Sequence, residues 1–182
     1  MRFLILSLVA MMASTSFAQN IDDITGPIAW NACQQAEKTA NQIKVNSSRA
    51  TTALGKAGAA LGTVPAEYAS DFQRRYDALR TDLGHASRHH GTGSGYLAMG
   101  NGAFGVIKAR VATGNWLGVT DASDSCSKNF YKAIGHLNNA SMGYGHIESA
   151  AADLEREIIQ FVSMLEAFED WYGDSPDYDD YR

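Results

Sequence analysis

Histidines at helical spacing are the residues of this chain best suited to chemistry. His85 and His89 are four residues apart, so on a helix they share one face, and Asp82 lies within about 60° of them in projection. Neutral imidazole nitrogens bind zinc and copper well, so the pair predicts a metal site. Asp82 and His89 are two turns apart, about 10 Å along a helix, so a further ligand from His136 or His146 would be needed. The alternative is a solvated helix end whose His and Arg side chains interact with the helix dipole.

Three other patterns that could carry catalysis do not fit the chemistry they suggest. The acids of 155–157 and 166–170 could suggest the paired carboxylates of glycoside hydrolases, but outward-facing acids on a helix are commoner. The segment 93–95 (Gly-Ser-Gly) lacks the spacing of a serine nucleophile elbow. The glycines of 100–105 match a dinucleotide fingerprint but lack the strand that should precede it. We therefore expect a non-enzymatic protein, with no catalytic residue and no cofactor other than zinc or copper at the histidines.

The two cysteines, Cys33 and Cys126, are expected to form a disulfide. They lie far apart in the sequence and lack the Cys-x-x-Cys spacing of redox sites. Thiols of exported proteins are oxidised, so a single bond between them is the default. It would close a long loop and stabilise the fold by up to about 4–5 kcal/mol in the chain-entropy model. Two separate buried thiols are the alternative.

Residues 1–18 have the parts of a secretion signal. Arg2 supplies the positive charge, 3–13 an apolar run too short to span a bilayer, and Ala18 a small residue before the cleavage point. No later stretch reaches about 20 uninterrupted apolar residues. We therefore expect export to a periplasm or the extracellular space, a mature chain that starts near Gln19, and no transmembrane segment after signal removal.

Charge is unevenly distributed along the chain. The formal net charge is −5, yet residues 38–132 hold twelve Lys or Arg against six acids, and 133–182 hold two against eleven. An acidic total without a basic run argues against nucleic acid as a partner. Surfaces of opposite sign could pair within an oligomer, and solvated helix faces are the plainer interpretation.

Apolar residues recur at spacings of three and four, which predicts amphipathic helices. Gly62 should end the first helix and Pro65 begin the second. No heptad array dictates a coiled coil, and no linker divides the chain. We therefore predict an all-α fold, a single-domain bundle of four or five helices over 19–173 with one disulfide. The expected helical segments are 28–61, 65–90, 96–111, 126–139 and 147–172.

A glycine-rich segment, 91–118, is the compositional anomaly. It holds eight glycines and only two charged residues, Lys108 and Arg110. We expect 91–95 to be a flexible connection and 96–111 a buried central helix. Glycines inside a helix cost about 1 kcal/mol each relative to Ala, so we expect them to let another backbone approach closely. A glycine-bent pair of strands is the alternative.

The chain ends in acids that alternate with aromatic residues. Residues 174–182 cannot bury a core, so we expect a flexible tail. Aromatic side chains of the whole end segment, 171–182, would anchor a partner, the alternative being a solubilising end. Together with the seams of small residues and the uneven charge, the tail predicts a protein that acts by protein–protein interaction or self-assembly. Metal binding through His85 and His89 is the alternative function. The predicted partner-binding residues are Trp171, Tyr172, Tyr178 and Tyr181.

Overall fold

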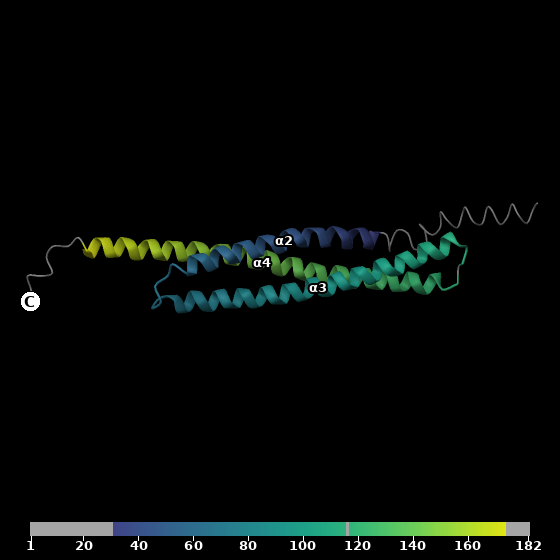
Figure 1. The fold of residues 1–182 in the computed structure, drawn as a ribbon, viewed down its shortest axis with the longest axis horizontal. Helices are drawn as coiled ribbons and strands as arrows, with labels where there is room; N and C mark the ends of the chain where they lie inside the picture. The colour runs from purple at the N-terminus through teal and green to yellow at the C-terminus, as the bar shows by residue number, and fades with distance from the viewer. Residues whose placement is uncertain (1–30, 116, 174–182) are drawn as a thin grey trace, which may run out of the picture. The chain divides into compact units, whose positions relative to one another are not determined.

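The computed structural model describes residues 31–115 and 117–173, and these residues contain three helices and no strand. Helix α2 spans Asn31–Leu61, α3 spans Ala69–Ala112 and α4 spans Val119–Gly173 (Figure 1). The predicted all-α class is confirmed. Within the described ranges, no helix combines the length and apolar content needed to cross a bilayer. The predicted signal at 1–18 and tail at 174–182 lie outside the described residues.

The predicted count of four or five helices is wrong for the described residues. Residues 91–95, expected to be a flexible connection, lie in the middle of α3. Residues 142–145, which fall between the predicted helices 126–139 and 147–172, lie in the middle of α4. Glycine weakens a helix by about 1 kcal/mol per residue. It does not end a helix whose neighbouring turns are held by tertiary packing, which supplies most helical stability in proteins. Two pairs of predicted helices therefore merge into two long ones.

Glycine and proline mark the places where the chain does turn. Helix α2 ends one residue before Gly62, as predicted, and α3 begins at Ala69, four residues after Pro65. Between α3 and α4, Gly114 and Gly118 have φ angles of 68° and 72°. Glycine adopts this left-handed conformation without the strain that a Cβ would cause.

Contacts divide the molecule into two compact units. Within the described residues, the first unit comprises 31–43 and 88–140, and the second unit comprises 44–87 and 141–173. Each unit therefore contains one part of α2, one of α3 and one of α4, and each buries its own core.

Buried positions recur every seven residues in all three helices, and in α4 the steps between them alternate between four and three residues. This is the spacing by which coiled-coil helices pack, so the expectation of no heptad array is wrong. In α2 the fully buried residues at intervals of seven are Ala36, Ile43, Ala50 and Ala57. In α3 the corresponding buried residues are Leu79, Ala86, Gly93, Gly100 and Ile107. In α4 the buried series is Cys126, Phe130, Ala133, Leu137, Ala140, Tyr144, Ile147, Ala151, Leu154 and Ile158.

The second unit has an apolar core with large side chains. Phe161 of α4 packs edge-on against Tyr68 at a centroid distance of 5.6 Å and tilted against Phe72 at 5.5 Å. On the surface, the Arg75 guanidinium donates to both carboxylate oxygens of Glu157, at 2.5 and 3.1 Å. These side chains are about half exposed, so the pair contributes at most about 1 kcal/mol. The core is formed by Leu54, Ala57, Leu61, Val64, Leu79, Ala151, Leu154 and Ile158.

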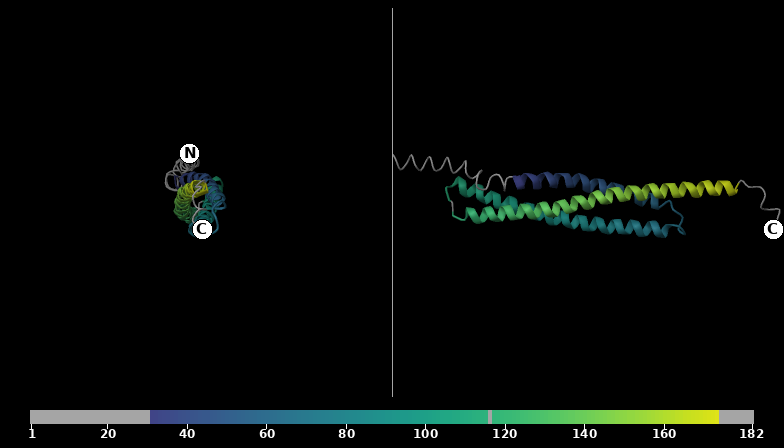
Figure 2. Two further views of the ribbon diagram at one scale, coloured as in Figure 1. Left: turned by 90° about the vertical axis from the view of Figure 1, so that its left-hand side faces the viewer. Right: turned by 180° about the vertical axis from the view of Figure 1, so that it is seen from behind.

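The last turns of α4 extend past the turn that joins α2 and α3. Two opposite views show this end of the second unit, coloured yellow (Figures 1 and 2). Phe161 still packs against the unit, whereas Met164, Phe168 and Trp171 are 64, 59 and 71% exposed. The helix therefore carries apolar residues into solvent at this end.

The first unit is held together by close approach of α3 and α4. A Cβ built on Gly93 would lie 2.7 Å from Leu137 Cγ and 3.1 Å from the Leu137 backbone nitrogen. A Cβ on Gly100 would lie 2.7 Å from two ring carbons of Phe130. Leu137 and Phe130 are fully buried, so each large side chain of α4 fills the space left by a glycine of α3. The predicted role of glycine in backbone approach is confirmed at Gly100, whereas Gly93, which has the same role, lies in 91–95, the predicted flexible connection.

The structure corrects the predicted disulfide, because Cys33 and Cys126 are both free buried thiols. Each sulfur has a separate hydrogen-bond acceptor on α3. Cys33 Sγ donates to Asn101 Oδ1 at 3.7 Å, and Cys126 Sγ donates to the carbonyl of Gly100 at 3.6 Å. The two thiols are thus bound to adjacent residues of α3 instead of to each other.

A pair of alanine substitutions two residues apart tests the close approach. Gly93→Ala should lower the free energy of unfolding by about 1–3 kcal/mol, because its methyl would push against the α4 backbone. Gly95→Ala should raise it by about 0.5–1 kcal/mol, because that Cβ meets nothing within 4 Å and alanine favours the helix. Urea unfolding followed by circular dichroism measures both. Equal stabilisation by the two substitutions would show that α3 and α4 are not in tight contact.

Candidate functional site

The structure brings His89 of α3 to His136 of α4 in the first unit. Their Nδ1 atoms are 3.2 Å apart, a hydrogen-bond distance, and their ring centroids are 5.5 Å apart. His85 and His146 are exposed, whereas His89 and His136 are half-buried. The sequence predicts His85 and His89 as a metal-binding pair, and names His136 only as a possible further ligand. The contact between helices pairs His89 with His136.

Aromatic packing restrains this histidine pair. The ring of Tyr96 stacks on His136 at a centroid distance of 5.6 Å and an interplanar angle of 15°. The Lys132 ammonium lies over the ring of Tyr96, 5.3 Å from its centroid. Sequence reasoning missed Tyr96, because only the α3–α4 register shows which aromatic residue lies beside His136. Among the described residues, no group of three or more His, Cys, Asp or Glu could hold a metal ion.

The two thiols are chemically protected. Burial raises the pKa of Cys126 from 9.0 to about 11, and the neighbouring Cys33 adds to the effect. Burial also raises the pKa of Cys33, and the negative charge of Glu37 raises it further by a smaller amount. A thiolate, not a thiol, is the reactive nucleophile and metal ligand. Both sulfurs are therefore held in their unreactive form at neutral pH.

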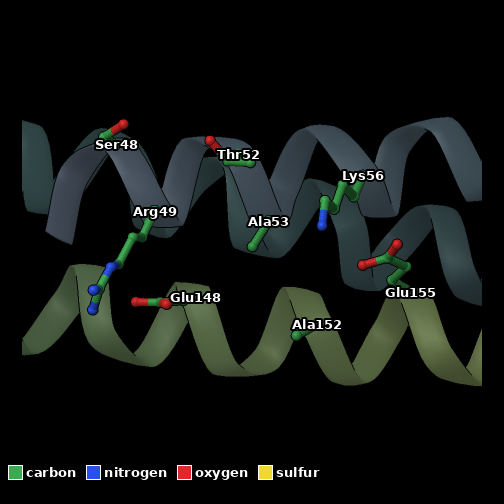
Figure 3. A pocket seen from close by; sticks show the side chains of 8 residues that line it. All are labelled: Ser48, Arg49, Thr52, Ala53, Lys56, Glu148, Ala152 and Glu155. Atoms are coloured by element: carbon green, nitrogen blue, oxygen red, sulfur yellow. The ribbon is translucent and has the colours of Figure 1, made fainter. Parts of the chain in front are cut away.

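A groove in the second unit runs between α2 and α4 (Figure 3). Arg49 of α2 points toward Glu148 of α4, and Lys56 of α2 faces Glu155 of α4. Its volume is about 300 Å³, and the two cations and two acids balance in charge. The lining of the groove therefore has no net charge that would favour an anionic or a cationic ligand. Its remaining lining residues are Ser48, Thr52, Ala53 and Ala152.

A second seam of small residues follows the exposed face of α3 in the first unit. We call it the outer seam: Gly91, Gly95, Ala98, Gly102, Gly105 and Ala109, all exposed and spaced alternately by four and three. In the part of the chain that the structure describes, a Cβ on any of its four glycines would meet nothing within 4 Å. Beside the seam, Met99 and Val106 are 52 and 45% exposed. No charged residue occurs in 91–107. The outer seam is therefore a flat, uncharged helix face about 27 Å long.

The predicted partner-binding aromatics are only partly described. Trp171 is exposed near the end of α4. The helix includes Tyr172, while Tyr178 and Tyr181 lie outside the described residues. Since α4 runs to Gly173, the described part of this set belongs to the helix, in agreement with the predicted helical segment 147–172.

Thiol reactivity tests the buried cysteines. In native reduced protein at pH 9, alkylation of Cys126 should be at least about tenfold slower than in denaturant, because its pKa of about 11 keeps it protonated. The same shift predicts that the free energy of unfolding falls as pH rises from 9.0 towards 11, where the unfolded thiol ionises and the folded one does not. Peptide mapping by mass spectrometry gives the rate at each cysteine. Equal rates in the native and denatured protein, or a Cys33–Cys126 crosslink before reduction, would contradict two protected free thiols.

Comparison with known proteins identifies no relative of this chain. No family model, curated protein or solved structure matches the chain.

Proposed function

We propose that this chain is an exported, non-enzymatic helical protein that acts by protein–protein interaction or self-assembly, using the outer seam of α3. The observation that carries the proposal is that the small residues of the outer seam are exposed and recur at heptad spacing. In the first unit, α3 uses the same spacing of small residues to receive α4 at Gly93 and Gly100. The outer seam repeats that arrangement on a face where no side chain of residues 31–115 or 117–173 fills the space above its glycines.

The free-energy cost of the exposed glycines supports the binding of another molecule to the outer seam. Each exposed glycine in a helix costs about 1 kcal/mol relative to alanine. The four glycines of the outer seam together cost about 4 kcal/mol, and open space above them shows that packing among the described residues does not require them. A helix from another molecule could approach such a face closely, since small residues let two backbones come together. Burial of Met99 and Val106 beside the seam would add apolar contact area.

Charge indicates the kind of helix that would fit. The outer seam carries no charge, whereas Arg88, Lys108 and Arg110 lie at its two ends on the same helix. A partner helix with a small or apolar face and acidic ends would complement this pattern. The acid-rich α4 of a second copy is one such helix, so self-assembly and a separate protein partner both fit.

The exposed end of α4 offers a second contact region. Met164, Phe168 and Trp171 place apolar side chains at the surface beside Glu166, Glu169 and Asp170. Aromatic anchors within a polar rim are typical of protein interfaces. Export rests on the signal pattern of residues 1–18.

Leucine substitutions on two exposed glycines test the outer seam. Gly102→Leu should weaken association at least about tenfold, equivalent to about 1.4 kcal/mol, because its side chain would hold a partner backbone away. Stability of the isolated chain should not fall, because the Cβ has open space and leucine favours the helix. Gly135→Leu on α4 is the matched control, since Gly135 is also exposed with nothing within 4 Å of its Cβ but lies off the seam.

Association is measured by light scattering of the purified protein and by crosslinking in its native compartment. The proposal expects an oligomer or a crosslinked partner that Gly102→Leu reduces and Gly135→Leu retains. A monomer without any crosslinked partner would contradict interaction as the function. Equal loss in both variants would place the interface elsewhere than on the outer seam.

A further inference from the structure

Two imidazole nitrogens from different helices lie next to each other in the first unit. His89 Nδ1 and His136 Nδ1 are 3.2 Å apart, and both side chains are half-buried and reachable from solvent. We propose that His89 and His136 form a binding site for a divalent transition-metal ion of the zinc and copper class, which bridges α3 and α4. This site does not depend on the proposed interaction through the outer seam.

The nitrogen separation matches that of two ligands on one ion. Metal–nitrogen bonds of about 2.0–2.1 Å with ligand angles of about 90–110° place neighbouring nitrogens about 2.8–3.4 Å apart. The observed 3.2 Å lies within this interval. Without metal, one Nδ1 carries a hydrogen and donates it to the other. To bind an ion, that ring must lose its Nδ1 proton to solvent and take one at Nε2, so both Nδ1 lone pairs face the ion.

The surrounding packing holds the site in place. Tyr96 stacks on the His136 ring at 15°, which restricts the rotation of the imidazole. The two ligands come from long helices whose backbones approach closely at Gly93 and Leu137, beside the histidines in sequence. Ligands held before the metal arrives lose less conformational freedom on binding.

The neighbourhood also sets the class of ion and limits affinity. Two imidazoles suit zinc, copper and nickel, and copper(II) binds most tightly of the divalent first-row ions. The described residues add no third protein ligand, so water or a group from another molecule would complete the coordination. The Lys132 ammonium, 5.3 Å from the Tyr96 centroid, adds a like charge nearby. We therefore expect an open, exchangeable site and not a structural metal centre.

Metal titration of the tag-free full-length chain tests the site. Copper(II) and, separately, zinc are titrated by calorimetry into the wild type, His89→Gln and His136→Gln. The controls are His85→Gln and His146→Gln, which change exposed histidines on the same two helices. We expect one ion per chain in the wild type, at least tenfold weaker binding in either site variant, and less than twofold change in either control. Glutamine keeps a polar group of similar size, and circular dichroism without metal establishes that each variant is folded.

A second measurement does not depend on any variant. Electron paramagnetic resonance of the copper(II)-loaded wild type should show coupling to two imidazole nitrogens. No binding, or a signal from a single imidazole, would overturn the site. Loss of binding in His85→Gln with retention in His136→Gln would also overturn it, by assigning the ion to two histidines of α3. Gly102→Leu should bind metal as the wild type does, so failure of the metal site and failure of the outer seam are distinguishable.

Discussion

The first unit depends on two glycines that let α3 approach α4. Leu137 and Phe130 occupy the volume that a Cβ at Gly93 or Gly100 would need. Because both large side chains are fully buried, they have no room to move aside. The same approach sets the distance between His89 and His136, the stack of Tyr96 on His136, and the acceptors on α3 that bind the two thiols. A change in helix separation would therefore alter all of these contacts together.

The glycines of α3 divide into two chemical roles that composition alone does not separate. Gly93 and Gly100 face α4, while Gly91, Gly95, Gly102 and Gly105 face open space. Residues two positions apart on a helix point about 200° apart. Alternating roles along one glycine-rich segment are thus a direct result of helical geometry, and they give α3 two faces suited to close helix packing, of which α4 covers one.

The helical class and most core residues could be predicted from sequence, because apolar side chains such as Ile43, Leu137 and Ile158 recur at helical intervals. The helix count could not. Gly91 to Gly95 and Gly143 to Gly145 look like breaks by propensity, and only packing between helices explains why α3 and α4 continue through them. The heptads are hard to recognise in the sequence because alanine, glycine, cysteine and tyrosine fill many core positions. The small residues resemble surface residues, so the apolar pattern is interrupted.

The candidate site shows the same limit. His89 could be singled out by its spacing from His85, but its contact with His136 joins residues 47 positions apart, and one helix period carries no information about the neighbouring helix. The cysteines illustrate the converse. Their pairing was inferred from compartment chemistry, whereas local acceptors on Gly100 and Asn101 determine where each sulfur lies.

The sequence of side-chain sizes along α3 also opposes sliding of one helix past the other in one direction. Gly93 and Gly100 are seven residues apart, and so are their partners Leu137 and Phe130. A slip of one heptad that placed Gly100 opposite Leu137 would keep that contact, but would bring Ile107 opposite Phe130. Both side chains are buried and large, and no space exists for the pair. Ile107 therefore opposes a slip of α3 past α4 in this direction, although the seven-residue period by itself would permit it.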